Sequence, residues 1–205
     1  MTTIYICRHS TPFKEHRGKE NISMDFLMWN KMSPLSVEGE KRAERLSENL
    51  KDIDVVWSSD YVRAMSTAKY VAQKNNIKVN IDERLGERIH GIIPPNLNIE
   101  EYEVNQLRDK NHKLKDGENQ AEVSERITEC INEIIKENYG KNIFICSHST
   151  AITFFLLNYC TLNFNTRELL YKNKKVFDFN WNTPELFKLT YAEDYKIISI
   201  ENIKI

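Results

Sequence analysis

The chain has 205 residues and a formal net charge of −1 at pH 7, from 29 lysines and arginines against 30 aspartates and glutamates. Hydrophobic residues make up 40% of the sequence, which argues against intrinsic disorder and favours one domain spanning residues 1–205. The balanced charge argues against nucleic acid or a membrane surface as partner, because proteins that bind either usually carry a basic excess. None of the four cysteines forms a CxxC pair, so the spacing indicates neither a zinc ribbon nor a redox motif.

The start of the chain does not look like an export signal. The apolar run at residues 4–7 stops at Arg8, and a signal peptide needs a longer one. The apolar residues at 151–157 are too few to span a bilayer. We therefore expect a cytoplasmic protein with reduced thiols.

Predicted strands alternate with predicted helices along the chain. Strands are expected at residues 3–7, 54–58, 78–81, 142–146, 186–191 and 196–203, and helices at 36–52, 61–74, 120–139 and 150–159. Residues 82–117 read as a less regular stretch. This alternation predicts an α/β fold, a three-layer sandwich with a mostly parallel central sheet flanked by helices. The last two strands are expected to form an antiparallel edge.

Two segments far apart in the chain are nearly the same. Residues 4–11 read Ile-Tyr-Ile-Cys-Arg-His-Ser-Thr and residues 143–150 read Ile-Phe-Ile-Cys-Ser-His-Ser-Thr, identical at six of eight positions. Each reads as a buried strand that ends in a histidine, with the cysteine as a small core residue. Ligands of parallel sheets bind beyond the carboxyl ends of the strands, so we expect His9 and His148 to reach into one crevice.

Two arginines are expected at the same sheet edge. Arg8 precedes the first histidine, and Arg63 lies in the first turn of the helix after the strand at 54–58. Such a cluster of cationic donors is costly to assemble without an anion, and guanidinium groups match phosphate oxygens. A single histidine at a strand end is more often structural, but this matched set favours a phosphoryl-group site.

Further blocks of sequence resemble the histidine phosphatase, or phosphoglycerate mutase-like, superfamily. Arg8-His9 resembles the family's Arg-His-Gly signature, and Leu-Ser-Val-Glu-Gly at 35–39 resembles the start of its next helix. Residues 59–68 resemble its Ser-x-x-x-Arg-Ala-x-x-Thr-Ala block. Three later landmarks follow at 85–91, 117–119 and 147–148. Each block alone is a weak signal, but their order and spacing across residues 1–160 form a strong one.

The resemblance implies a phosphatase that hydrolyses a phosphomonoester, a small phosphorylated metabolite, through a phosphohistidine. His9 is then the nucleophile, and Arg8, Arg63 and His148 hold the phosphate. Glu87 protonates the leaving oxygen, so the catalytic residues are His9, Glu87 and His148. His148 is expected to stay charged beside a dianionic phosphate. No metal and no cofactor is expected, because no metal-ligand cluster is visible.

The sequence departs from the family pattern near both histidines. Ser10 and Ser149 replace glycines that let backbone approach phosphate, so we expect a tighter or altered pocket. Glu15, acidic where polar residues often stand, is expected to point away from the phosphate.

Two further segments have more than one interpretation. Residues 82–117 correspond to the family's lid insertion, and the basic residues there form either a lid over an anionic substrate or, as the charge pattern favours, a solvated face. These are Arg108, Lys110, His112, Lys113 and Lys115. The apolar residues 24–29 line the pocket, cover the sheet or make a homodimer contact, with packing favoured.

Two other functions stay open. A phosphomutase would return the phosphoryl group to substrate, but mutases of the superfamily tend to have a larger insertion and tail, so we expect water as acceptor. A non-catalytic phospho-ligand-binding protein would need the clamp but not Glu87, and the changes at Ser10 and Ser149 keep it open.

Overall fold

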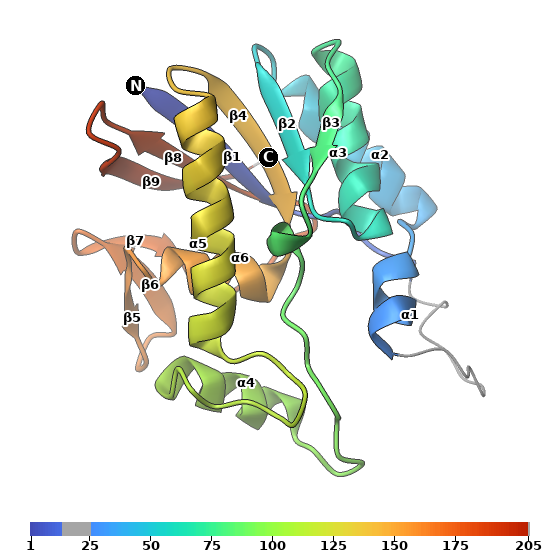
Figure 1. The fold of residues 1–205 in the computed structure, drawn as a ribbon, viewed down its shortest axis with the longest axis vertical. Helices are drawn as coiled ribbons and strands as arrows, with labels where there is room; N and C mark the ends of the chain where they lie inside the picture. The colour runs from blue at the N-terminus through green and yellow to red at the C-terminus, as the bar shows by residue number, and fades with distance from the viewer. Residues whose placement is uncertain (14–25, 205) are drawn as a thin grey trace.

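The computed structural model describes residues 1–13 and 26–204, and its centre is a six-stranded sheet (Figure 1). The strand order is β3-β2-β4-β1-β8-β9. Strands β1 to β4 run parallel, whereas β8 and β9 are antiparallel, as predicted. The strands are β1 (Thr2–Arg8), β2 (Val55–Ser58), β3 (Val79–Ile81), β4 (Asn142–Ser147), β8 (Glu185–Tyr191) and β9 (Ile197–Ile203).

Helices cover both faces of this sheet, which confirms the three-layer prediction (Figure 1). Alternate residues of β4 face opposite layers: Ile143 and Ile145 pack in one core cluster with the helices of one face, Phe144 and Cys146 in a second cluster with those of the other. The helices are α5 (Gln120–Glu137) and α6 (Ser149–Leu156) on the first face, and α2 (Val37–Glu48) and α3 (Val62–Lys74) on the second.

Local sequence explains where the main helices begin. The side chain of Ser36 accepts a hydrogen bond from the Gly39 N–H and caps α2. Asn119 and Glu122 form a reciprocal capping box at the start of α5. Helix α2 ends at Glu48, four residues before the predicted end at residue 52. Asp52 has a φ of 64°, which is not helical, and the chain turns there toward β2.

Three regions differ from the sequence prediction. Residues 82–117 contain a 3₁₀ turn (Glu83–Leu85) and helix α4 (Ile99–Arg108), and the loop-like segment 24–29 contains the start of α1 (Phe26–Met32). A second, antiparallel sheet lies at the end of the main one, with strands β5 (Thr161–Asn163), β6 (Glu168–Tyr171) and β7 (Lys174–Phe177). These elements are short, and α4 buries only Tyr102 and Gln106, so their sequence periodicity is weak.

All four cysteines are buried and free, which includes Cys7 and Cys146, the two expected as small core residues. No helix in the described ranges is both long and apolar enough to cross a bilayer. Glu15 and Met24 lie outside the described residues, so the interpretations placed on them are not addressed by the structure.

Candidate active site

The two histidines of the repeated octapeptide lie side by side at one sheet edge. Strands β1 and β4 are parallel neighbours, and their register pairs Ile4 with Ile143 and Arg8 with Ser147. The identical sequences are therefore aligned position for position. His9 and His148 come directly after these aligned strands. The centroids of their rings are 5.1 Å apart, and both side chains are buried. The two rings thus meet at the carboxyl edge of the sheet, where the sequence placed them.

Arg63 lies between the two rings. Its Nε donates to Nε2 of His9 at 2.9 Å, and its Nη2 lies 3.3 Å from Nδ1 of His148. Its Nη1 donates to the carbonyl of Asn30 in α1 at 2.6 Å, and Tyr61 packs under the guanidinium at 4.7 Å. The first turn of α3 thus supplies a buried, fixed cation at the centre of the cluster.

Hydrogen bonds define the proton positions on His9. Its Nδ1 lies 2.7 Å from the carbonyl oxygen of Ser10, which can only accept, so Nδ1 carries the proton. Its Nε2 then holds a lone pair and accepts from Arg63. The ring is held as a neutral imidazole with its unprotonated nitrogen facing the cation.

His148 has a different environment. Its Nδ1 faces Arg63 and its Nε2 lies 2.8 Å from the hydroxyl of Ser59, at the end of β2. Burial, and then the charge of Arg63, lower the pKa of His148 well below its usual value. The protein's own surroundings therefore favour a neutral ring. The expected positive charge would need a phosphoryl dianion to offset Arg63.

Arg8 is the last residue of β1 and directly precedes His9. Its Nη1 donates to the carbonyl of Asn182 at 3.3 Å, and its guanidinium lies 5.6 Å from the centre of the Trp181 ring. The segment before β8 thus holds this second cation at the same edge as Arg63.

The carboxylate of Glu87 lies at the N-terminus of α6, the helix that begins directly after His148. Its carboxylate accepts from the backbone N–H of Ala151 at 3.1 Å and from the backbone N–H of Arg88 at 2.9 Å. The Ser149 hydroxyl and the Thr150 N–H lie within 3.4 Å of the same group. The structure thus brings all five predicted residues to one sheet edge.

The two serines that replace family glycines have structural partners. Ser10 is buried, its hydroxyl donates to the carbonyl of Gly39 at 2.7 Å, and its N–H donates to Thr67 at 2.9 Å. A Cβ at Gly39 would lie 2.1 Å from the Thr11 carbonyl, so α2 packs closely against this loop. Ser10 therefore fixes the loop after His9.

Two neighbours of His148 were given no role from the sequence, although Ser59 was placed at the same sheet edge. Ser59 bonds to it, and the Tyr61 ring packs against it at 4.4 Å. Both directly follow β2, at the same sheet edge as the histidines. Their place at a strand end was the signal that could have identified them.

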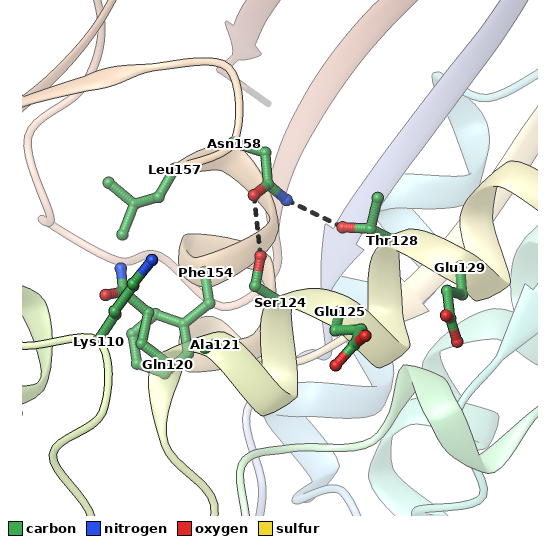
Figure 2. Close-up of a pocket in the computed structure, with 10 residues that line it drawn as sticks. All are labelled: Lys110, Gln120, Ala121, Ser124, Glu125, Thr128, Glu129, Phe154, Leu157 and Asn158. Atoms are coloured by element: carbon green, nitrogen blue, oxygen red, sulfur yellow. Dashed lines mark hydrogen bonds between the residues drawn. The ribbon is translucent and has the colours of Figure 1, made fainter.

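A small cavity of about 140 Å³ adjoins the cluster. Its wall includes Ser149 and Thr150, beside the Glu87 carboxylate, and Trp181, beside Arg8. A larger hollow of about 560 Å³ lies outside α5 and α6, where Asn158 accepts from the Ser124 hydroxyl and donates to the Thr128 hydroxyl (Figure 2). That hollow contains none of the predicted site residues.

The basic residues of 108–115 form a solvated face, not a lid pointing at the cluster. All of them except His112 are exposed. Lys113 pairs with Glu122 at 2.5 Å, and Arg108 lies over the Phe164 ring. Among the described residues, no three His, Cys, Asp or Glu side chains gather as a metal-ligand group, and metal independence stays a prediction.

Known proteins share both the sequence pattern and the fold. "Probable phosphoglycerate mutase GpmB" of Salmonella arizonae is 26% identical over 168 residues, covering 74% of this chain and 72% of that protein. "Phosphoserine phosphatase 1" of Hydrogenobacter thermophilus is 28% identical over 137 residues, covering 62% and 64%.

Among solved structures, a mycobacterial glucosyl-3-phosphoglycerate phosphatase in complex with VO3 superposes with a TM-score of 0.70 at 16% identity, over 99% of this chain and 98% of that one. This likeness concerns the fold. The sequence model of the histidine phosphatase superfamily (branch 1) matches residues 4–189 of this chain. The chain therefore belongs to the histidine phosphatase superfamily.

Proposed function

We propose that this protein is a phosphatase that hydrolyses a small phosphomonoester through a phosphohistidine on His9. The supporting observation is the state of that ring: Nδ1 is protonated against the Ser10 carbonyl, and Nε2 carries the lone pair. A histidine attacks phosphorus only as the neutral imidazole. Here the attacking nitrogen and the cation that would meet the phosphoryl oxygens are 2.9 Å apart.

In this proposal Arg8, Arg63 and His148 hold the transferring group. Phosphoryl transfer spreads charge over the equatorial oxygens, and fixed cationic donors around them lower the barrier. Arg63 and His148 are buried in this arrangement, so little reorganisation is needed during the reaction. The phosphorus–oxygen ester bond breaks as the bond from His9 Nε2 to phosphorus forms.

Glu87 is the proposed general acid. Its carboxyl group lies 3.4 Å from the hydroxyl of Ser149, which lines the small cavity where an ester oxygen would leave. After it protonates that oxygen, the same group takes a proton from water, which attacks the phosphohistidine and releases inorganic phosphate. We also propose that the whole chain forms one catalytic domain and that residues 82–117, with α4, cover the leaving group.

Rapid acid-free denaturation during turnover, followed by mass spectrometry, tests this proposal. The expected result is an acid-labile phosphoryl group on His9, with inorganic phosphate released stoichiometrically and activity unchanged by a chelator. Clean isomerisation of a phosphoglycerate with little phosphate released would place the protein with the mutases. Binding of phosphate or vanadate without phosphoenzyme or turnover on any phosphomonoester would support a ligand-binding role instead.

A further inference from the structure

The segment that carries Glu87 belongs to no helix or strand. Residues 86–91 follow the 3₁₀ turn as irregular chain that leads toward α4. A general acid must hold its proton within hydrogen-bond reach of the leaving oxygen, and a displacement of about 1 Å in an active site costs about 10²-fold in rate. Because neither a helix nor a sheet fixes this segment, the position of the carboxyl group depends on side chains from other elements.

Arg126, on α5, bonds to the backbone at Glu87 and just before it. Its Nη1 donates to the carbonyl oxygens of Arg84 at 2.7 Å and Gly86 at 3.0 Å, and its Nη2 donates to that of Glu87 at 3.2 Å. Its Nε and Nη2 also donate to the two oxygens of the Glu118 carboxylate, at 2.7 and 2.9 Å. These bonds use every N–H group of the guanidinium.

Glu118 holds the chain on the other side of Glu87. Its carboxylate accepts from the N–H of Ile89 at 2.8 Å, and its own N–H donates to the Ile89 carbonyl at 2.8 Å. Only 20% of the Arg126 side chain and 18% of the Glu118 side chain are exposed, so the pair is largely shielded from water. The two partners therefore bracket Glu87, one bonding to the chain before it and the other to the chain after it.

A residue of α4 joins this support. Gln106 is fully buried, and its Nε2 donates to the carbonyl of Glu118 at 2.9 Å. Its Oε1 accepts from the guanidinium of Arg88, the residue after Glu87. Helix α4 is thus bonded both to the Arg126–Glu118 pair and to the segment of the proposed acid.

We propose that Arg126 is a positioning residue for the general acid, and that with Glu118 it holds the Glu87 carboxyl group where the leaving oxygen departs. The N–H groups of Arg126 all have acceptors within the protein and its charge is offset by Glu118, whereas Arg63 donates directly to His9. The proposal rests on the phosphatase function above and adds to it a residue that acts through Glu87. Loss of Arg126 should therefore impair proton delivery and leave phosphate binding in place.

Arg126→Lys tests this role, because lysine keeps the charge but loses the planar fork that holds several acceptors at once. The kcat/KM for alkyl phosphates should fall by about tenfold to a hundredfold, mainly through kcat, because the displaced acid no longer reaches the leaving oxygen. The kcat/KM for nitrophenyl phosphate, whose leaving group needs no proton, and the Ki for vanadate should change much less. An equal loss on alkyl and nitrophenyl esters would show that Arg126 only supports the fold, and would overturn the proposal.

The same substitution in a Glu87→Gln background gives a sharper test. If Arg126 acts through Glu87, Arg126→Lys should change kcat/KM for alkyl phosphates by no more than about twofold once the acid is gone. A second loss as large as the first would overturn the proposal. Arg84→Lys is the matched control, because the Arg84 side chain also joins this turn to α5, through Glu133 at 2.6 Å. It should leave the ratio of alkyl to nitrophenyl rates unchanged, and a shift as large as that of Arg126→Lys would contradict a specific role for Arg126.

Failure of the positioning role and failure of the phosphatase function give different results. If the wild type hydrolyses neither ester, the phosphatase function fails. If Glu87→Gln depends on the leaving group but Arg126→Lys does not, only the positioning role fails; if neither depends on it, the acid assignment and the positioning role fall together. If Arg126→Lys does not fold, Glu118→Gln replaces it, since it keeps the guanidinium but removes the charge that orients it, and the same dependence on the leaving group is required.

Discussion

The two strand ends of β1 and β4 have almost the same sequence but hold their histidines in opposite ways. After β1 the chain continues as a loop, and His9 bonds to the carbonyl of Ser10 in that loop. After β4 the chain enters α6, with His148 at the N-cap position, and its ring is held by Ser59 and Arg63 from other elements. The local sequence places a histidine at the sheet edge, and the next element decides what the ring can do.

This difference agrees with the two roles proposed, a nucleophile for His9 and a group that binds charge for His148. His9 has one nitrogen held by its own loop and one that accepts from Arg63. Both nitrogens of His148 have partners from other elements, and its ring lies deeper, with none of its surface exposed. The comparison predicts that substitutions at the two histidines fail in different ways.

Replacing the nucleophile should have the largest effect. His9→Gln removes the only proposed acceptor of the phosphoryl group, so kcat should fall by about 10⁴-fold or more. No phosphoenzyme should form during turnover. Turnover near the wild-type rate would show that His9 is not the nucleophile.

Replacing the second histidine should leave the chemistry in place but slow it. His148→Gln removes one donor to the phosphoryl oxygens, and loss of such a donor costs about 10²–10³-fold in kcat. Quenched-flow labelling should still find the phosphoryl group on His9. If the label disappears along with activity, His148 does more than stabilise charge.

The proposed acid at the start of α6 should matter according to the leaving group. Glu87→Gln keeps the shape but removes the proton, so kcat/KM for alkyl phosphates should fall by about a hundredfold or more. Nitrophenyl phosphate releases a stabilised phenolate that needs no proton, so the decrease in kcat/KM for this ester should be clearly smaller. Equal losses on both esters would mean that Glu87 supports the site and does not deliver the proton; no loss on either would point to another carboxylate such as Glu118.

Removing the support of one ring should sharpen the comparison further. Ser59→Ala deletes the hydroxyl that bonds to His148, and a lost hydrogen bond of this kind is worth about tenfold in kcat/KM. Thr67→Val is the matched change on the other side, because it removes the acceptor of the Ser10 N–H in the nucleophile loop. We expect Ser59→Ala to raise KM for phosphate esters or Ki for vanadate, and Thr67→Val to lower kcat. The same kinetic profile in both variants would contradict separate roles.

The smallest expected effect concerns stability at mildly acidic pH. The pKa of His148 is lowered in the folded protein, so the unfolded chain binds the extra proton more readily below about pH 6.5. The contribution of this ring to stability is therefore complete above that pH and is lost as pH falls, by at most about 1.4 kcal/mol per pH unit. We expect the free energy of unfolding, measured with urea between pH 7 and 5, to change less with pH in His148→Gln than in the wild type. An unchanged slope would mean that the buried ring is charged in the native state.

Much of this site was predictable because short-range patterns determine it. A buried strand of a parallel sheet must end at the carboxyl edge, so the positions of His9, His148 and Ser59 follow once the strands are recognised. Arg63 lies in the first turn of a helix whose apolar stripe is clear in the sequence. The proton positions on both rings were not predictable, because they depend on a carbonyl and a hydroxyl that only the folded chain brings into place.

The small cavity beside the cluster could not be predicted for the same reason. Arg88 and Gln106 look like ordinary polar residues in a charged segment, and neither lies in a recognisable periodic pattern. Their burial depends on α4 folding back over the chain after β3, a long-range packing event. The strands of 161–177 were missed because each has only three or four residues, too few to show an alternation.

The placement of β1 between β4 and β8 also constrains the synthesis of the protein. Both neighbours of this first strand lie in the second half of the sequence, so β1 has no partner until they leave the ribosome. At ordinary translation rates that delay is about 7–30 s after β1 itself has emerged. An apolar strand left unpaired that long is open to association with other chains. The nascent protein should therefore depend on chaperones that shield its first residues, and lowering the temperature during expression should increase the yield of folded enzyme.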